Sequence, residues 1–131
     1  MKPQRPYLLR ALYEWIVDCD QIPYVLVDAT VAGVQVPQEH IKDGQIVLNM
    51  GPNAVQDLVI DDQYVMCGGR FGGKHFELYV PMLAVLAIYA KDTRKGMVFP
   101  DEENLTAAER HTHEGDSAPN PRDDKPSLRL V

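Results

Sequence analysis

The spacing with the clearest chemical meaning is a glycine-rich run at residues 68–75, Gly-Gly-Arg-Phe-Gly-Gly-Lys-His. It matches a phosphate-binding P-loop, except that His75 stands where that loop carries the Ser or Thr that binds Mg²⁺. The flanking segments, 64–67 and 76–80, both read as strands, whereas the anion site of a P-loop needs a helix N-terminus after it. We therefore expect turn glycines here rather than a nucleotide site.

No other group of side chains forms a catalytic or metal site by its spacing. His111 and His113 lie two residues apart without a third ligand nearby, and Cys19 and Cys67 lack the close spacing of a zinc site. We expect two free, buried thiols. No Ser, Cys or carboxylate can be assigned a base and an orienting partner. The sequence therefore predicts no enzyme, no metal and no cofactor.

The charge of the chain argues against a nucleic-acid partner. Its 13 Lys and Arg face 19 Asp and Glu, a net charge of −6, whereas nonspecific nucleic-acid affinity comes from clustered positive charge. Residues 1–100 carry 9 basic and 11 acidic side chains, a net charge of −2, and residues 101–131 carry 4 and 8, a net charge of −4. The acidity is therefore concentrated in the last part of the chain.

Neither export nor membrane insertion is expected from the sequence. The basic residues near the start resemble those of a signal sequence, but Glu14 and Asp18 interrupt the apolar stretch that follows. The uncharged apolar run at 78–90 is shorter than the roughly 20 residues that span a bilayer. We expect a soluble, cytoplasmic protein.

One helix is expected near the start of the chain, over about residues 6–19. Pro6 suits the first helical turn, where its missing N–H has no helical partner. Polar side chains recur at every fourth position, and apolar ones cover most of the remaining circumference. A surface helix of a monomer needs only one apolar face, so we expect this helix to pack on the β domain and on a second copy in a two-fold dimer. The residues expected at that dimer interface are Leu8, Leu12, Tyr13 and Trp15.

From residue 24 the pattern changes to short β-rich runs separated by turn residues. The runs are 24–28, 34–36, 46–50, 55–60, 64–67 and 76–80. Strands this short and closely spaced leave little room for parallel crossovers. We therefore expect a mainly β domain over residues 1–100, an antiparallel barrel or sandwich with an N-terminal helix. Residues 82–91 fit either a helix or a strand.

The hydrophobic pattern stops after Pro100. Residues 101–125 are rich in Asp, Glu, Asn, Pro, Ser and Thr, and such a segment buries too little surface to offset the entropy of ordering. We expect a disordered acidic linker there. Apolar residues return in the final segment, 126–131, in the arrangement of a binding motif carried on a linker.

Six short segments, taken in order, form the most specific pattern in the chain. They are Arg-Pro-Tyr-Leu-Leu-Arg-Ala-Leu-Tyr-Glu-Trp at 5–15, Val-Asp-Ala-Thr at 27–30, Gly-Val-Gln-Val-Pro at 33–37, Asp-Gly-Gln-Ile-Val-Leu-Asn at 43–49, Arg-Phe-Gly-Gly at 70–73 and Leu-Ala-Ile-Tyr-Ala at 86–90. Together they resemble the stringent starvation protein B (SspB) family. The resemblance returns at 125–131, Lys-Pro-Ser-Leu-Arg-Leu-Val.

The resemblance implies a dimeric, Sm-like antiparallel β domain that acts as an adaptor rather than an enzyme. Proteins of this family bind the ssrA tag that is added to stalled nascent chains. A flexible tail docks on ClpX, the unfoldase of the ClpXP protease. The residues expected to dock on the N-terminal domain of ClpX are Leu128, Arg129, Leu130 and Val131.

We expect the tag to lie in a groove beside Arg70 and Phe71, because glycines on both sides of this pair let a peptide backbone approach closely. The expected peptide-binding residues are Leu48, Met50, Ala54, Val55, Arg70, Phe71 and Gly72. An Sm-like RNA-binding module is the alternative function. The net negative charge of residues 1–100 disfavours it.

Overall fold

The computed structural model describes residues 1–100 of the chain. One helix is followed by seven strands and two short 3-10 turns in this part. The elements are α1 (Arg5–Asp18), β1 (Pro23–Asp28), η1 (Gln38–His40), β2 (Gln45–Asn49), β3 (Val55–Ile60), β4 (Tyr64–Phe71), β5 (Lys74–Pro81), η2 (Met82–Ala84), β6 (Val85–Ala90) and β7 (Gly96–Val98). The predicted linker, 101–125, and the predicted docking motif, 126–131, lie outside the described residues.

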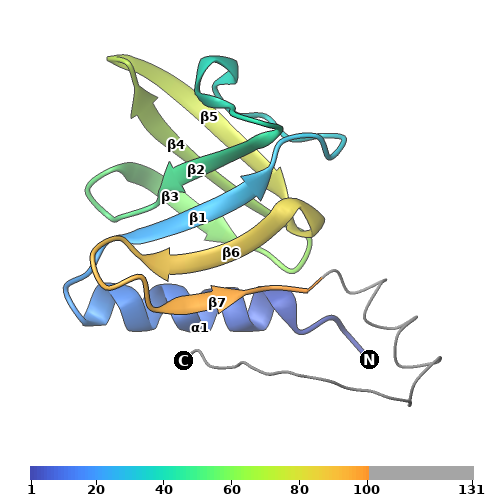
Figure 1. The fold of residues 1–131 in the computed structure, drawn as a ribbon, viewed down its shortest axis with the longest axis vertical. Helices are drawn as coiled ribbons and strands as arrows, with labels where there is room; N and C mark the ends of the chain where they lie inside the picture. Colours follow the sequence, from blue (N-terminus) through green and yellow to red (C-terminus); the bar gives the residue numbers. More distant parts are fainter. Residues whose placement is uncertain (101–131) are drawn as a thin grey trace.

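The strands form two antiparallel sheets. The first has the strand order β2-β1-β6-β7 and the second the order β3-β4-β5. They face each other as a sandwich that does not close into a barrel, with α1 across one end (Figure 1). The prediction of a mainly β domain with one N-terminal helix is confirmed.

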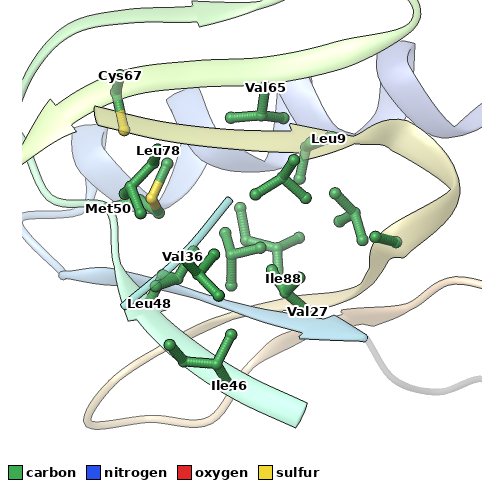
Figure 2. Close-up of a cluster of buried hydrophobic side chains, with 14 of the residues drawn as sticks. Leu9, Val27, Val36, Ile46, Leu48, Met50, Val65, Cys67, Leu78 and Ile88 are labelled. Atoms are coloured by element: carbon green, nitrogen blue, oxygen red, sulfur yellow. The ribbon is translucent and has the colours of Figure 1, made fainter. Parts of the chain in front are cut away.

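The core fills the space between the two sheets. Strands β1 and β2 alternate buried and more exposed residues, as expected for strands with one face on a core. Val27 and Ile88 of the first sheet pack with Val65 and Leu78 of the second (Figure 2). Helix α1 adds Leu9, which is 1% exposed, so the same core holds the helix and both sheets.

Several predicted element boundaries are wrong. The glycines that follow residue 67 continue strand β4 to Phe71, and only Gly72 and Gly73 form the turn to β5. Residues 34–36 do not form a strand; Gln35 makes a single antiparallel bridge to Tyr79. Residues 82–91, which were compatible with a helix or a strand, divide into η2 and β6. Strand β7 was not predicted.

A buried arginine fastens the start of α1 to the sandwich. Arg5 is 3% exposed, and its guanidinium donates hydrogen bonds to the backbone carbonyls of Met82, Leu83, Val85 and Pro100. Its Nε is buried without a hydrogen-bond partner in the described residues. Because buried charge is costly unless its polar groups are satisfied, these carbonyls make the helix N-terminus a fixed point of the fold.

The expectation of two buried thiols is half right. Cys67 is buried, but Cys19 is exposed at the C-terminal end of α1. Burial, with a smaller contribution from the charge of Glu77, raises the pKa of the Cys67 thiol to about 11. No helix in residues 1–100 is long and apolar enough to cross a membrane.

The two thiols predict a difference in reactivity. Iodoacetamide at pH 8 should modify Cys19 in the folded protein and leave Cys67 intact, because the thiolate is the reactive form and Cys67 is both buried and largely protonated. Mass spectrometry of the Cys19→Ser variant should find no modification until the protein is unfolded. Modification of folded Cys67 at the rate of Cys19 would contradict this.

Candidate functional site

A tight hairpin sets the start of strand β2. Lys42 and Gln45 exchange two backbone hydrogen bonds of 2.8 and 2.9 Å. The two residues between them, Asp43 and Gly44, have φ angles of 53° and 77°, as a two-residue turn with positive φ at both central positions requires. This turn fixes the register in which β2 begins.

The hydrogen-bond ladder gives β2 an unpaired edge. The Ala29 N–H donates to the Gly44 carbonyl at 2.7 Å, and the Met50 N–H donates to the Pro23 carbonyl at 2.9 Å. Backbone groups along an antiparallel strand alternate in direction, so even-numbered residues of β2 face β1. The backbone groups of Val47 and Asn49 therefore face away from β1, on the side where β2 has no neighbouring strand in the described part of the chain.

A recess of about 470 Å³ lies beside this edge. The lining residues are Leu26, His40, Lys42, Gln45, Ile46, Val47, Asn49 and Phe71. Its surface is mainly apolar, and its charged or titratable side chains, Lys42 and His40, are basic. Such a recess suits apolar side chains together with a carboxylate.

Phe71 forms the far wall of the recess. Its ring lies edge-on to Phe76 at a centroid distance of 6.4 Å and tilted to His40 at 6.2 Å. A Cβ on Gly69 would come within 3.1 Å of this ring. The missing side chain of Gly69 therefore lets Phe71 lie close to its own strand.

The predicted peptide-binding residues lie in different surroundings. Leu48, Met50 and Val55 are buried in the core, at 1%, 3% and 7% exposure, and none of them lines the recess. Ala54 lies in a neighbouring recess with Asn49 and the turn at 51–53. Among the predicted residues, only Phe71 lines the recess beside β2.

Arg70 and Gly72 lie at the tip of the β4–β5 hairpin. Neighbouring side chains of a strand point to opposite faces, so Arg70 lies on the face of β4 away from the Phe71 ring. Its guanidinium donates a long hydrogen bond, 3.4 Å, to the Gly73 carbonyl. Gly72 has φ 61°, and a Cβ there would meet nothing within 4 Å, so its role is conformational.

Sequence reasoning missed most of the residues on the recess surface. The polar residues Gln45 and Asn49 alternate with buried Ile46 and Leu48 in β2, and this alternation was readable from the sequence. His40 and Lys42 reach the recess only because the chain turns back at residues 42–45. The Asp-Gly pair at 43–44 is a local signal of that turn, but the placement of His40 beside Phe71 joins residues far apart in the sequence, and no local pattern contains it.

The far end of β2 is held by the helix. The Tyr13 hydroxyl donates a hydrogen bond of 2.9 Å to the Met50 carbonyl, and burial is the main cause that raises the pKa of Tyr13. The Asn49 side-chain oxygen accepts a bond of 3.0 Å from the Gly51 N–H. The edge strand is therefore anchored at both ends.

The predicted dimer residues fall on two sides of α1. Leu8 and Leu12 are partly buried against the core, and Tyr13 points toward β2. Trp15 leaves 45% of its surface exposed and Tyr7 leaves 46%. Tyr7 and Trp15, eight residues apart, lie on one outward stripe of the helix, and sequence reasoning had not included Tyr7.

The described residues define a class of protein: a small two-sheet β domain with an N-terminal helix and an unpaired strand edge beside an apolar recess. The family model for stringent starvation protein B matches residues 3–129. A curated relative from Haemophilus influenzae, named stringent starvation protein B homolog, is 50% identical over 101 residues, which cover 77% of this chain and 67% of the relative. The chain belongs to the stringent starvation protein B family.

The anchoring of β2 yields a prediction about stability. Tyr13→Phe should lower the free energy of unfolding by about 1–2 kcal/mol, because it leaves the Met50 carbonyl without its donor. Urea denaturation measures the change. Tyr24→Phe is the matched control, since the described structure gives the Tyr24 hydroxyl no hydrogen bond, and it should change the free energy by less than about 0.5 kcal/mol. Equal losses in the two variants would refute this role of Tyr13.

Proposed function

We propose that this protein is a non-enzymatic adaptor that binds the ssrA tag and delivers tagged substrates to the ClpXP protease. Family membership gives the class of function. The observation that carries the binding mode is the unpaired edge of β2, where the backbone groups of Val47 and Asn49 face an open side next to the recess.

An extended peptide can add to such an edge as a further strand. Main-chain hydrogen bonds then supply affinity, and pockets for alternate side chains supply specificity. The peptide's apolar side chains would lie against Val47 and Phe71, and Lys42 would attract a carboxylate. The β2 edge thus accounts for the binding of an extended tag without a deep pocket.

The predicted site residues take different parts in this proposal. Phe71 contacts the tag, and Arg70 and Gly72 lie at the rim formed by the hairpin tip. Ala54 borders the neighbouring recess at the far end of the edge. The other three predicted residues are buried in the core and would support the edge from the core side. They are Leu48, Met50 and Val55.

The strand-addition proposal predicts the effect of one backbone change. Val47→Pro removes an N–H that faces away from β1, so the β1–β2 ladder should survive while tag binding weakens about tenfold or more. Fluorescence anisotropy with a labelled ssrA peptide measures affinity, and circular dichroism checks the fold.

Val47→Thr is the matched control, because it keeps the N–H and the shape of the side chain. It should retain most of the affinity. Binding by Val47→Pro that equals the unchanged protein would place the tag elsewhere, even if the adaptor function holds.

We further propose that the protein acts as a two-fold dimer through the outward surface of α1. The exposed area of Trp15, with the partly exposed Leu8 and Leu12, gives an apolar surface that a second copy of the helix would cover. Tyr13 was also predicted at this interface, but its hydroxyl bonds the Met50 carbonyl. It would therefore support the interface from the side of α1 that packs on the β domain. Two tag sites would then be held in one particle.

The dimer proposal is tested by adding a charge to this surface. Trp15→Glu should shift the protein from dimer to monomer at micromolar concentration in sedimentation velocity, because a charge within an apolar interface is not compensated. Val59→Glu is the matched control: Val59, in β3, is exposed to the same degree, 46%. A monomeric unchanged protein would contradict the proposal.

The last part of the proposed function lies outside the described residues. Leu128, Arg129, Leu130 and Val131 would dock on the N-terminal domain of ClpX. A flexible linker of about 25 residues has an r.m.s. span of roughly 25–30 Å and gives an effective concentration on the order of millimolar. A captured tag would therefore stay close to the unfoldase without contact between ClpX and the β domain.

Removing residues 128–131 should separate binding from delivery. Affinity for the tag should be unchanged, while the enhancement of ClpXP degradation of a dilute tagged substrate should disappear. Deletion of residues 115–118, which removes the same number of residues inside the predicted linker, should keep the enhancement. Enhancement that survives loss of the last four residues would refute the tether.

A further inference from the structure

The first sheet has a second unpaired edge, at strand β7. The Ala90 N–H donates to the Lys95 carbonyl at 2.8 Å, and the Phe99 N–H donates to the Leu86 carbonyl at 2.7 Å. By the same alternation as in β2, the backbone groups of Gly96 and Val98 face away from β6. Strand β7 ends its sheet in the described residues, so this edge can accept another strand.

An apolar row of side chains leads across the sheet to this edge. Leu26 pairs with Val47 on one side and with Ala87 on the other, and Ala87 pairs with Val98. By register these four residues share one face of the sheet, opposite to that of Val27 and Ile88, and within the row Ala87 is buried at 3% exposure. Val98 ends the row with 76% of its surface exposed, an unusual position for a large apolar side chain in a strand that also has free backbone groups.

A recess of about 490 Å³ lies along β7. Its lining consists of Ala87, Ile88, Tyr89, Arg94, Lys95, Gly96, Met97 and Val98. Two of these side chains are basic and none is acidic. The recess therefore combines an apolar floor with positive charge at one end.

Two features hold the recess in shape. Gly96 lies so close to β6 that a Cβ there would come within 2.0 Å of the Ile88 carbonyl oxygen, so only glycine permits this pairing. Arg94 has φ 63°, a left-handed conformation that is uncommon for a residue with a side chain. Its guanidinium lies over the Tyr89 ring, 5.5 Å from the centroid, and both residues belong to the lining of the recess.

We propose that the β7 edge is a second docking site, which takes an extended peptide with alternating apolar and acidic side chains. Main-chain bonds to Gly96 and Val98 hold the peptide, its apolar side chains cover the exposed Val98, and its carboxylates pair with Arg94 and Lys95. This site is separate from the β2 edge, which lies at the opposite end of the sheet, and it does not depend on tag binding there.

The test uses the full chain and a fluorescein-labelled peptide, Asp-Val-Glu-Val-Asp-Val. Anisotropy should report binding that persists when an unlabelled ssrA peptide is present in excess. The lysine counterpart, Lys-Val-Lys-Val-Lys-Val, should bind at least tenfold more weakly, because its charge repels the basic recess.

Two variants and one control locate the site. Arg94→Gln with Lys95→Glu should weaken binding of the acidic peptide at least tenfold and leave ssrA binding unchanged. Val98→Pro, which removes an outward-facing N–H, should weaken it by a similar factor. Lys74→Gln with Lys91→Glu makes the same change in net charge at exposed positions outside both recesses and should change binding less than threefold.

Four results would overturn the proposal. The first is that the acidic peptide does not bind at millimolar concentration, and the second is that the control and the recess variants lose equal affinity for it. The third is that the ssrA peptide displaces it, and the fourth is that Val98→Pro changes the oligomeric state. The last would show that a second copy of the chain occupies the edge. Failure of ssrA binding alone would count against the proposed adaptor function and leave this site standing.

Discussion

The antiparallel ladder between β1 and β2 is the constraint on which the rest of this structure depends. Even-numbered residues of β2 use their backbone groups to pair with β1, so Val47 and Asn49 must direct theirs to the open side. An exposed strand edge carries unpaired donors and acceptors, and proteins that keep one must control what pairs with it. Here the edge is short, begins at a fixed turn, and lies beside a mainly apolar recess.

The core explains why so short an edge keeps its position. Ile46 and Leu48 anchor β2 from beneath, while Tyr13 ties its far end to the helix. A one-residue shift of register would move both buried side chains into solvent. Arg5 in turn fastens the start of the helix to the turn before β6. The two surfaces proposed for binding, the β2 edge and the outward side of α1, therefore belong to one packed unit.

Local patterns in the sequence were sufficient for the helix, the class of fold and five of the strands. They failed where distant contacts decide the outcome. Gly68 and Gly69 read as turn residues, yet they continue β4 because His75 and Phe71 pack over the space where their side chains would be. Phe71, which was predicted from its glycine neighbours, lines the recess, and its part in peptide binding stays a prediction. The backbone direction of Val47 depends on pairing with a strand some twenty residues away, which no local pattern contains.

The central claim is that the open edge of β2 receives the tag as an added strand. Amide hydrogen exchange followed residue by residue, with and without the ssrA peptide, tests it directly. The account predicts that the amides of Val47 and Asn49 exchange readily in the free protein and become protected when the peptide binds, while Ile46 and Leu48 are protected in both states. Peptide-induced protection confined to other strands, with Val47 and Asn49 still exchanging freely, would contradict it.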